Sequence, residues 1–292
     1  MNIDTDKLDH TFIDKFEIPR SSALHRIEWT RGVDNNPEVS LKAQQLHGQS
    51  YVEYGYFDSR GLGGDGRLVP ELDGTREKPD SSAVINYLLA VPIGGEINEA
   101  TATLRMIDIG EGGTIDDIPT YKYFKNSLEG GVREKLEEIV AIHGNSSVRE
   151  VSALATASSK GSHLGSYELM RAIAQNAVIK RERTGISDIY IAALTSKSIK
   201  PVLNFAGHGA SEVIGSPVNI FTDDERSARD LQVIPVLLDP CAVIGGIVDE
   251  LHSATSVDQQ GLLVTKLKFM TDGLSDRQMG DRAAEALKVF NA

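Results

Sequence analysis

The sequence predicts an α/β fold in which a mixed central sheet is flanked by helices. Two β-rich runs, 83–93 and 101–109, are joined by a short turn with two glycines, which is typical of a hairpin. A buried strand, a loop with glycines and a long helical segment follow at 148–179. Helical and apolar runs alternate after it, and further strands are predicted at 188–194, 212–221 and 231–238.

The first third of the chain contains one predicted helix between two irregular segments. Residues 1–35 are polar and rich in loop-forming residues, with Pro19 and the single Trp29, and we expect an N-terminal arm or cap. Residues 38–56 have a helical rhythm. Residues 57–82 contain many Gly, Asp and Pro residues and predict a long surface loop.

The remaining helices follow from amphipathic spacing and from their first residues. Pro201 is compatible with the first turn of its helix, and Thr222 before three acidic residues is typical of a helix start. Helices are predicted at 132–142, 198–205, 241–252 and 277–290, with a further start at 222–229.

Composition excludes several classes of function. A net charge of −12 and a pI near 5.1 argue against a general role on nucleic acids or membrane surfaces. No apolar run approaches 20 residues, and the acidic N-terminus lacks the features of a signal peptide. The single Cys241 excludes an internal disulfide, so a cytoplasmic location is the default. The seven histidines lack paired spacing, so we expect no metal site.

The segment from the strand at 151–155 to the helix expected from Ser166 carries the clearest chemical signal. A strand that passes through a glycine-bearing loop onto a helix N-terminus presents several backbone N–H groups in one direction. These donors and the helix dipole favour a phosphate or pyrophosphate. Glycines in such a loop also serve turn geometry alone, and the spacing leaves both interpretations open.

The loop Lys160-Gly161-Ser162-His163-Leu164-Gly165 resembles the acyl-CoA-binding motif of the GNAT acyltransferase superfamily, Arg/Gln-x-x-Gly-x-Gly/Ala. Lys160 keeps the basic first position and Gly165 the last glycine, whereas His163 stands where the family most often has its first glycine. The predicted order of helix, hairpin, strand, loop, helix, strand, helix and strand also matches the GNAT fold.

A narrower resemblance is to autoinducer (acyl-homoserine lactone) synthases and long-chain N-acyl amino acid synthases. Glu150 and Ser152 match the Glu-x-Ser-Arg of their central strand, with Ala153 in place of the Arg. His47 replaces a second Arg, in the first helix. The helix residues that fall close to the family pattern are Leu46, Tyr51, Glu53, Gly55 and Tyr56.

The resemblance implies transfer of an acyl group from acyl-CoA or an acyl carrier protein to the amine of a small, amino acid-like molecule. The acyl thioester is then a co-substrate, and no metal takes part. Loss of the two Arg residues favours an acceptor other than that of a homoserine lactone synthase. With this resemblance, we expect three parts of the chain: an N-terminal arm or cap (1–35), a GNAT-like acyltransferase domain (36–240) and a C-terminal helical extension (241–292). Two alternatives stay open: a non-catalytic acyl-thioester binding or sensing module, and an α/β scaffold with no acyl ligand.

Three residues are the catalytic candidates. Glu150 would bind the amine or relay its proton, Ser152 would contact the donor arm or the acceptor, and Tyr190 would act as acid to the leaving thiolate. Each has a structural alternative, namely a carboxylate at the strand edge, an ordinary strand residue and a core tyrosine.

The binding candidates are larger sets. The backbone of Val151, Ala153 and Ala155 would pair with the pantetheine arm like an added strand. Backbone N–H groups would contact the diphosphate from Lys160, Gly161, Ser162, His163, Leu164 and Gly165. An acyl pocket would be lined by Tyr51, Tyr121, Tyr123, Phe124 and Phe205, which otherwise form a hydrophobic cluster under a loop. A basic patch for the donor would be formed by Lys160, Lys180, Arg181, Arg183, Lys197 and Lys200, whose alternative is a solvated helix end.

Overall fold

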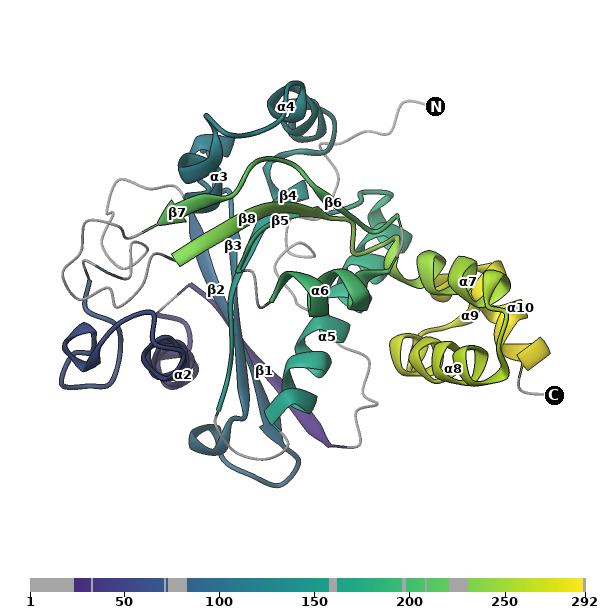
Figure 1. The fold of residues 1–292 in the computed structure, drawn as a ribbon, viewed down its shortest axis with the longest axis horizontal. Helices are drawn as coiled ribbons and strands as arrows, with labels where there is room; N and C mark the ends of the chain where they lie inside the picture. The colour runs from purple at the N-terminus through teal and green to yellow at the C-terminus, as the bar shows by residue number, and fades with distance from the viewer. Residues whose placement is uncertain are drawn as a thin grey trace.

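The structure is a computed structural model that describes residues 24–32, 34–70, 72, 83–157, 162–195, 198–207, 209–220 and 231–290. These residues form one eight-stranded sheet in the order β1-β2-β3-β4-β5-β8-β6, with β7 paired to β8. Helices cover both faces of the sheet, as Figure 1 shows. The predicted fold class, a mixed sheet flanked by helices, is therefore confirmed.

The sheet is antiparallel except at its centre. The strands are β1 (His25–Arg31), β2 (Val84–Pro92), β3 (Ala102–Asp108), β4 (Val148–Thr156), β5 (Ile189–Thr195), β6 (Ser211–Val213), β7 (Val218–Ile220) and β8 (Leu231–Leu238). Among the strands that the structure describes, only the neighbours β4 and β5 run parallel. The connection between two parallel strands needs a crossover, which α5 (Ser162–Thr184) provides.

Two parts of the sheet differ from the sequence prediction. The N-terminal arm expected over 1–35 includes the edge strand β1, which pairs with β2 along its whole length, and its Ile27 and Trp29 pack against the core below α5. The single strand expected at 212–221 is two short strands, β6 and β7. The helix start expected at 222–229 lies outside the described residues.

The two faces of the sheet carry different helices. α2 (Pro37–Glu53), α3 (Pro119–Phe124) and α4 (Val132–His143) lie on one face, where α2 packs on Tyr87, Leu89 and Val91 of β2. α5 lies on the other face against Leu88, Leu104 and Val151. The alternation of side chains along each strand sorts the core into these two layers.

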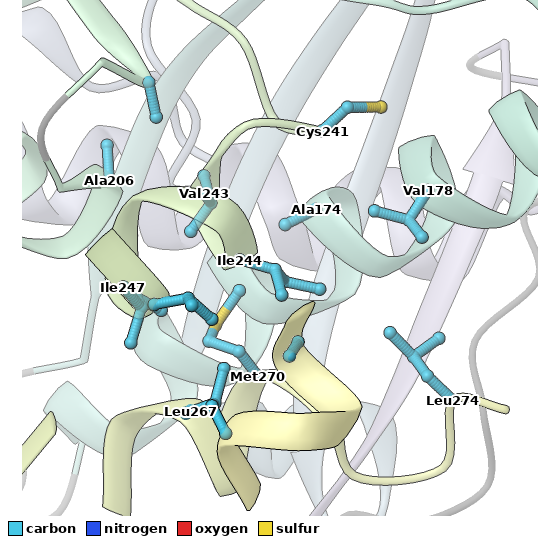
Figure 2. Packing of buried hydrophobic residues seen from close by; sticks show 14 of the residues in the cluster. Ala174, Val178, Ala206, Cys241, Val243, Ile244, Ile247, Leu267, Met270 and Leu274 are labelled. Carbon is cyan, nitrogen blue, oxygen red and sulfur yellow. The ribbon is translucent and has the colours of Figure 1, made fainter. Parts of the chain in front are cut away.

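The C-terminal helices pack mainly onto the outer side of α5 (Figure 1), and Leu238 at the end of β8 also contacts this cluster. Figure 2 shows Ala174 and Val178 of α5 together with Ile244, Ile247 and Met270 in one cluster. The helices after β5 are α6 (Ile199–Ala206), α7 (Val243–Ser253), α8 (Val257–Thr271), α9 (Asp276–Met279) and α10 (Asp281–Phe290). The sequence did not predict α8, and the single helix expected at 277–290 is two helices, α9 and α10. No helix in the described ranges has the length and apolarity required to cross a membrane.

Candidate functional site

The strands β4 and β5 separate near the middle of the sheet. Their ladder contains only three pairs, Val148↔Ile189, Arg149↔Tyr190 and Glu150↔Ile191, although β4 continues to Thr156 and β5 to Thr195. The outer edge of β4 pairs with β3, and that of β5 pairs with β8. Beyond the third pair, the two facing edges therefore present backbone N–H and C=O groups to which no described strand is paired. We call this region the fork.

A β-bulge lies in β4 just beyond the start of the fork. Arg105 of β3 is opposite Ser152, but Thr103 is opposite Ala155, so β4 has one extra residue in this interval. Ala153 has φ 51°, in the left-handed region that L-residues rarely adopt. A bulge bends its strand and leaves the extra residue outside the ladder, so the backbone groups of β4 here point in directions that differ from those of a regular strand.

Glu150 lies at the base of the fork, and its carboxylate is held from two sides. It is 1% exposed, and its Oε2 accepts a hydrogen bond from the backbone N–H of Thr120 at 2.7 Å. Its Oε1 lies 3.9 Å from a terminal nitrogen of Arg105. The alternative of a surface carboxylate at the strand edge is thus wrong, because the group is buried and has an adjacent cation.

Arg105 is a site residue that the sequence analysis missed. Its Nε donates a hydrogen bond to Ser152 Oγ at 3.0 Å, so it joins Ser152 and Glu150 in one group. The side chain is 12% exposed, on the face that carries α2 and α3. The available signal was a single Arg among apolar residues in the run 101–109, since a buried strand rarely carries an unpaired cation.

Two of the predicted pocket residues meet beside the fork. Tyr51 of α2 and Phe124 of α3 belong to one apolar cluster with Ala193 of β5. The ring of Tyr51 also lies 4.4 Å from that of His47 and 5.5 Å from that of Tyr56, measured between centroids. Thr120, whose N–H binds Glu150, lies one turn before Phe124 in α3, so this apolar wall begins about one helical turn from the buried carboxylate.

The other predicted pocket residues do not join this wall. Tyr121 packs below α4 with Leu136, and burial raises the pKa of its hydroxyl. Phe205 lies on the α5 side of the sheet, where its ring is 5.8 Å from that of Tyr167. The side chain of Tyr123 lies outside what the structure describes. The structure thus assembles Tyr51 and Phe124 but not all five residues.

Tyr190 is not part of the same group as Glu150 and Ser152. It pairs with Arg149, and successive residues of a strand point to opposite faces, so Tyr190 faces α5 while Glu150 faces α3. Tyr190 is 1% exposed, and burial, reinforced by Asp188, raises the pKa of its hydroxyl well above the usual value. The role of Tyr190 as acid to the thiolate stays a prediction, and the hydroxyl would have to act from the face opposite to that of Glu150.

The predicted phosphate loop is partly helix. α5 begins at Ser162, so Ser162, His163, Leu164 and Gly165 form its first turn rather than a loop. A Cβ on Gly165 would lie 2.5 Å from Thr101 Oγ1, which shows that this glycine permits close contact between helix and sheet. Lys160 and Gly161 lie outside the described residues. The first-turn N–H groups remain the donors that a helix N-terminus offers.

The described members of the predicted basic patch do not share one exposed surface. Lys180 is buried, with its Nζ 2.5 Å from Asp188 Oδ1. Arg181 and Arg183 lie at the other end of α5, about 30 Å from His163 at 1.5 Å per residue. Lys160 and Lys197 lie outside the described residues, and Lys200 is exposed on α6. Among the residues that the structure describes, no three His, Cys, Asp or Glu side chains are grouped so as to hold a metal ion.

No family model and no curated protein matches the sequence. The chain is similar to several solved structures. With the AHL synthase LasI it shares 12% sequence identity over 76% of this chain and 95% of that one, at a TM-score of 0.44. With FeeM, an N-acyl amino acid synthase from uncultured soil microbes, it shares 15% identity over 77% of this chain and 96% of that one, at a TM-score of 0.44. With the aminoglycoside acetyltransferase AAC(6')-Ib, in complex with coenzyme A and kanamycin, it shares 12% identity over 75% of this chain and 98% of that one, at a TM-score of 0.36.

Proposed function

We propose that the chain is an N-acyltransferase that moves an acyl group from a thioester donor to the amine of a small molecule. The observation that supports this most directly is the fork, where unpaired strand edges begin beside the buried pair of Glu150 and Arg105. An extended ligand can pair with a free strand edge, while a carboxylate next to it can receive a proton.

The donor arm would lie along β4. Backbone groups of Val151, Ala153 and Ala155 would pair with the amides of a pantetheine arm, which both acyl-CoA and an acyl carrier protein present. The phosphate end would reach the first turn of α5, with Lys160 as the added cation, because a helix N-terminus favours anions. The wall that contains Tyr51 and Phe124 would receive the acyl chain.

The reaction needs few groups. The amine nitrogen attacks the thioester carbonyl carbon, a C–N bond forms, and the C–S bond breaks. An acceptor that arrives as an ammonium first loses one proton through Glu150 to solvent. The proton that the neutral amine nitrogen loses on attack passes to Glu150 and ends on the leaving sulfur, so no separate acid is required. Backbone N–H groups at the bulge would donate to the carbonyl oxygen as its charge develops. Holding the two substrates together supplies much of the rate.

The acceptor that fits this site is amino acid-like. Glu150 and Arg105 carry opposite charges on adjacent strands, which complements a molecule with an ammonium and a carboxylate group. Guanidinium groups bind carboxylates with directional hydrogen bonds, so Arg105 would orient the acceptor while Glu150 faces its amine.

A thioester-binding module without catalysis is the second candidate. His163 in the first turn of α5 favours it, because this residue stands where the phosphate motif most often has its first glycine.

The test combines native mass spectrometry with turnover assays. The protein is titrated with acetyl-CoA, palmitoyl-CoA and a long-chain acyl carrier protein, and then assayed for amide formation with a panel of amino acids. In Glu150→Gln the amide oxygen can still accept from Thr120, so we expect donor binding to survive and turnover to fall about 100-fold or more. The matched control is Glu111→Gln, on an exposed turn. Binding without turnover would support the module, and absence of any thioester binding would overturn both candidates.

A further inference from the structure

A second group of buried charges lies beneath the fork, on the face that carries α5. Arg149 of β4 has its Nε 3.4 Å from Asp108 Oδ1 of β3 and 3.5 Å from Asp188 Oδ2, one residue before β5. Lys180 of α5 has its Nζ 2.5 Å from Asp188 Oδ1. The group therefore contains two cations and two carboxylates drawn from three neighbouring parts of the sheet and from the helix above them.

These ion pairs are buried, so the charges attract one another more strongly than they would in water, although the contacts of Arg149 at 3.4 and 3.5 Å are longer than ideal hydrogen bonds. Asp188 is 0% exposed and Arg149 5%, while Asn86 of β2 donates to Asp108 Oδ2 at 2.9 Å. Burial alone would lower the pKa of Arg149, but Asp108 and Asp188 outweigh it and raise that pKa, so the guanidinium stays charged. Charges held in this way resist separation, because parting them would leave each one buried and uncompensated.

The position of the group matters because the backbone ladder beside it is short. Arg149 and Tyr190 form the second of the three pairs that join β4 to β5, and Glu150 is in the third. Three pairs of a parallel ladder give few hydrogen bonds with which to hold two strands in register. The Arg149–Asp188 contact crosses the same boundary and adds a link that the backbone does not provide.

We propose that Arg149 is a positioning residue that, with Asp188 and Lys180, fixes the place where β4 and β5 separate. Its side chain points to the α5 face, away from Glu150, so it acts on the site only through the backbone of β4. The consequence for donor binding rests on the proposed function, whereas the hold on the strands does not.

The experiment uses charge-neutral double variants of the full chain. Arg149→Met with Asp108→Asn leaves the Lys180–Asp188 pair intact, and Lys180→Met with Asp188→Asn leaves the Arg149–Asp108 pair intact. Both variants remove the contact between Arg149 and the carboxylate of Asp188. The matched control is Arg282→Met with Asp249→Asn, an exposed ion pair on the C-terminal helices. Arg149→Lys keeps the positive charge that Arg149→Met removes, and it serves as the rescue variant.

Hydrogen–deuterium exchange and donor affinity are measured on each variant. We expect peptides covering 148–156 and 189–195 to exchange about tenfold faster in both double variants, with peptides of β1 and β2 unchanged. We also expect the Kd for a non-hydrolysable acyl-CoA to rise about tenfold. The control should behave as the parent protein, and Arg149→Lys should recover most of the difference.

Two results would overturn the hold of Arg149 on the strands. One is exchange at the fork that matches the parent, and the other is a rise shared equally by β1 and β2, which marks a global loss of stability. Faster exchange at the fork with unchanged donor affinity would overturn only its consequence for donor binding. If the parent protein binds no thioester, it is the proposed function that fails, and the exchange measurement alone decides whether Arg149 holds the strands.

Discussion

Arg105 on β3 donates from its Nε to Ser152 Oγ on β4 at 3.0 Å, with another nitrogen 3.9 Å from Glu150 Oε1. If this guanidinium binds the acceptor carboxylate, Arg105→Met should raise the KM for the acceptor about 10- to 100-fold, since a hydrogen bond to a charged group contributes about 1.5–3 kcal/mol. The KM for the thioester should change little. Steady-state kinetics with each substrate varied in turn will measure both constants.

Arg133→Met is the control for that variant, because Arg133 is an exposed cation on α4 that pairs with Glu137. A rise in the KM of the thioester alone would place Arg105 on the donor side and contradict the acceptor role.

The left-handed conformation of Ala153 predicts a stabilising substitution. Ala153→Gly should raise the free energy of unfolding by up to about 1 kcal/mol, because glycine adopts a φ of 51° without the steric cost that alanine has. Ala155→Gly, in the same strand but buried and without positive φ, should lower it by about 1 kcal/mol. Chemical denaturation of both variants checks the signs, and a loss of stability in Ala153→Gly would contradict the strain.

Replacing Gly165 should lower the free energy of unfolding, the opposite of the effect expected at Ala153. Gly165→Ala should cost about 1–3 kcal/mol, because the added methyl would meet Thr101 of the sheet. Gly261→Ala in α8 is the matched control, since a Cβ there has no neighbour within 4 Å, and alanine should stabilise that helix by about 1 kcal/mol. Thermal unfolding of the two variants should therefore move in opposite directions. Equal shifts would show that the close contact between α5 and the sheet is not decisive.

His25 predicts a loss of stability in mild acid. Burial lowers its pKa below 6.5, and Glu168, which faces it from α5, only partly opposes this. The unfolded chain therefore binds a proton more readily than the folded one, so the contribution is complete above pH ~6.5 and is lost as the pH falls toward the folded pKa. One such group gives a slope of at most about 1.4 kcal/mol per pH unit.

His25→Gln should flatten this part of the stability profile, measured by urea unfolding between pH 5 and 7.5, roughly the range in which a histidine titrates. His252→Gln, at an exposed position, is the control. An unchanged profile in His25→Gln would assign the acid sensitivity to other groups.

The sequence predicted the fold best at strands whose residues are mostly buried. The apolar run at 231–238 and the hairpin runs at 83–93 and 101–109 predicted β8, β2 and β3 within one or two residues, because their burial dictates their composition. β1 was missed although Ile27 and Trp29 alternate with Arg26 and Glu28, since the surrounding polar residues diluted the signal. α8 lacked a continuous apolar stripe because much of its surface is exposed.

The site was predictable only in part, since it depends on register. Glu150 and Ser152 came from the sequence, but Arg105 joins them through the pairing of β3 with β4. Tyr190 was assigned to them because spacing along the chain does not reveal which face a side chain takes. Gly165 was assigned to a turn, whereas its reason is contact with Thr101, a residue more than sixty positions earlier.

The packing of α5 against the last helices has a consequence for how the protein is made. Val178 of α5 and Met270 of α8 share one core, yet the ribosome adds them about 90 residues apart, which at 5–20 residues per second takes on the order of 5–20 s. During that interval the outer side of α5 has no cover from α8. Nascent chains halted before α8 should therefore bind chaperones that recognise apolar surface more strongly than chains released at full length.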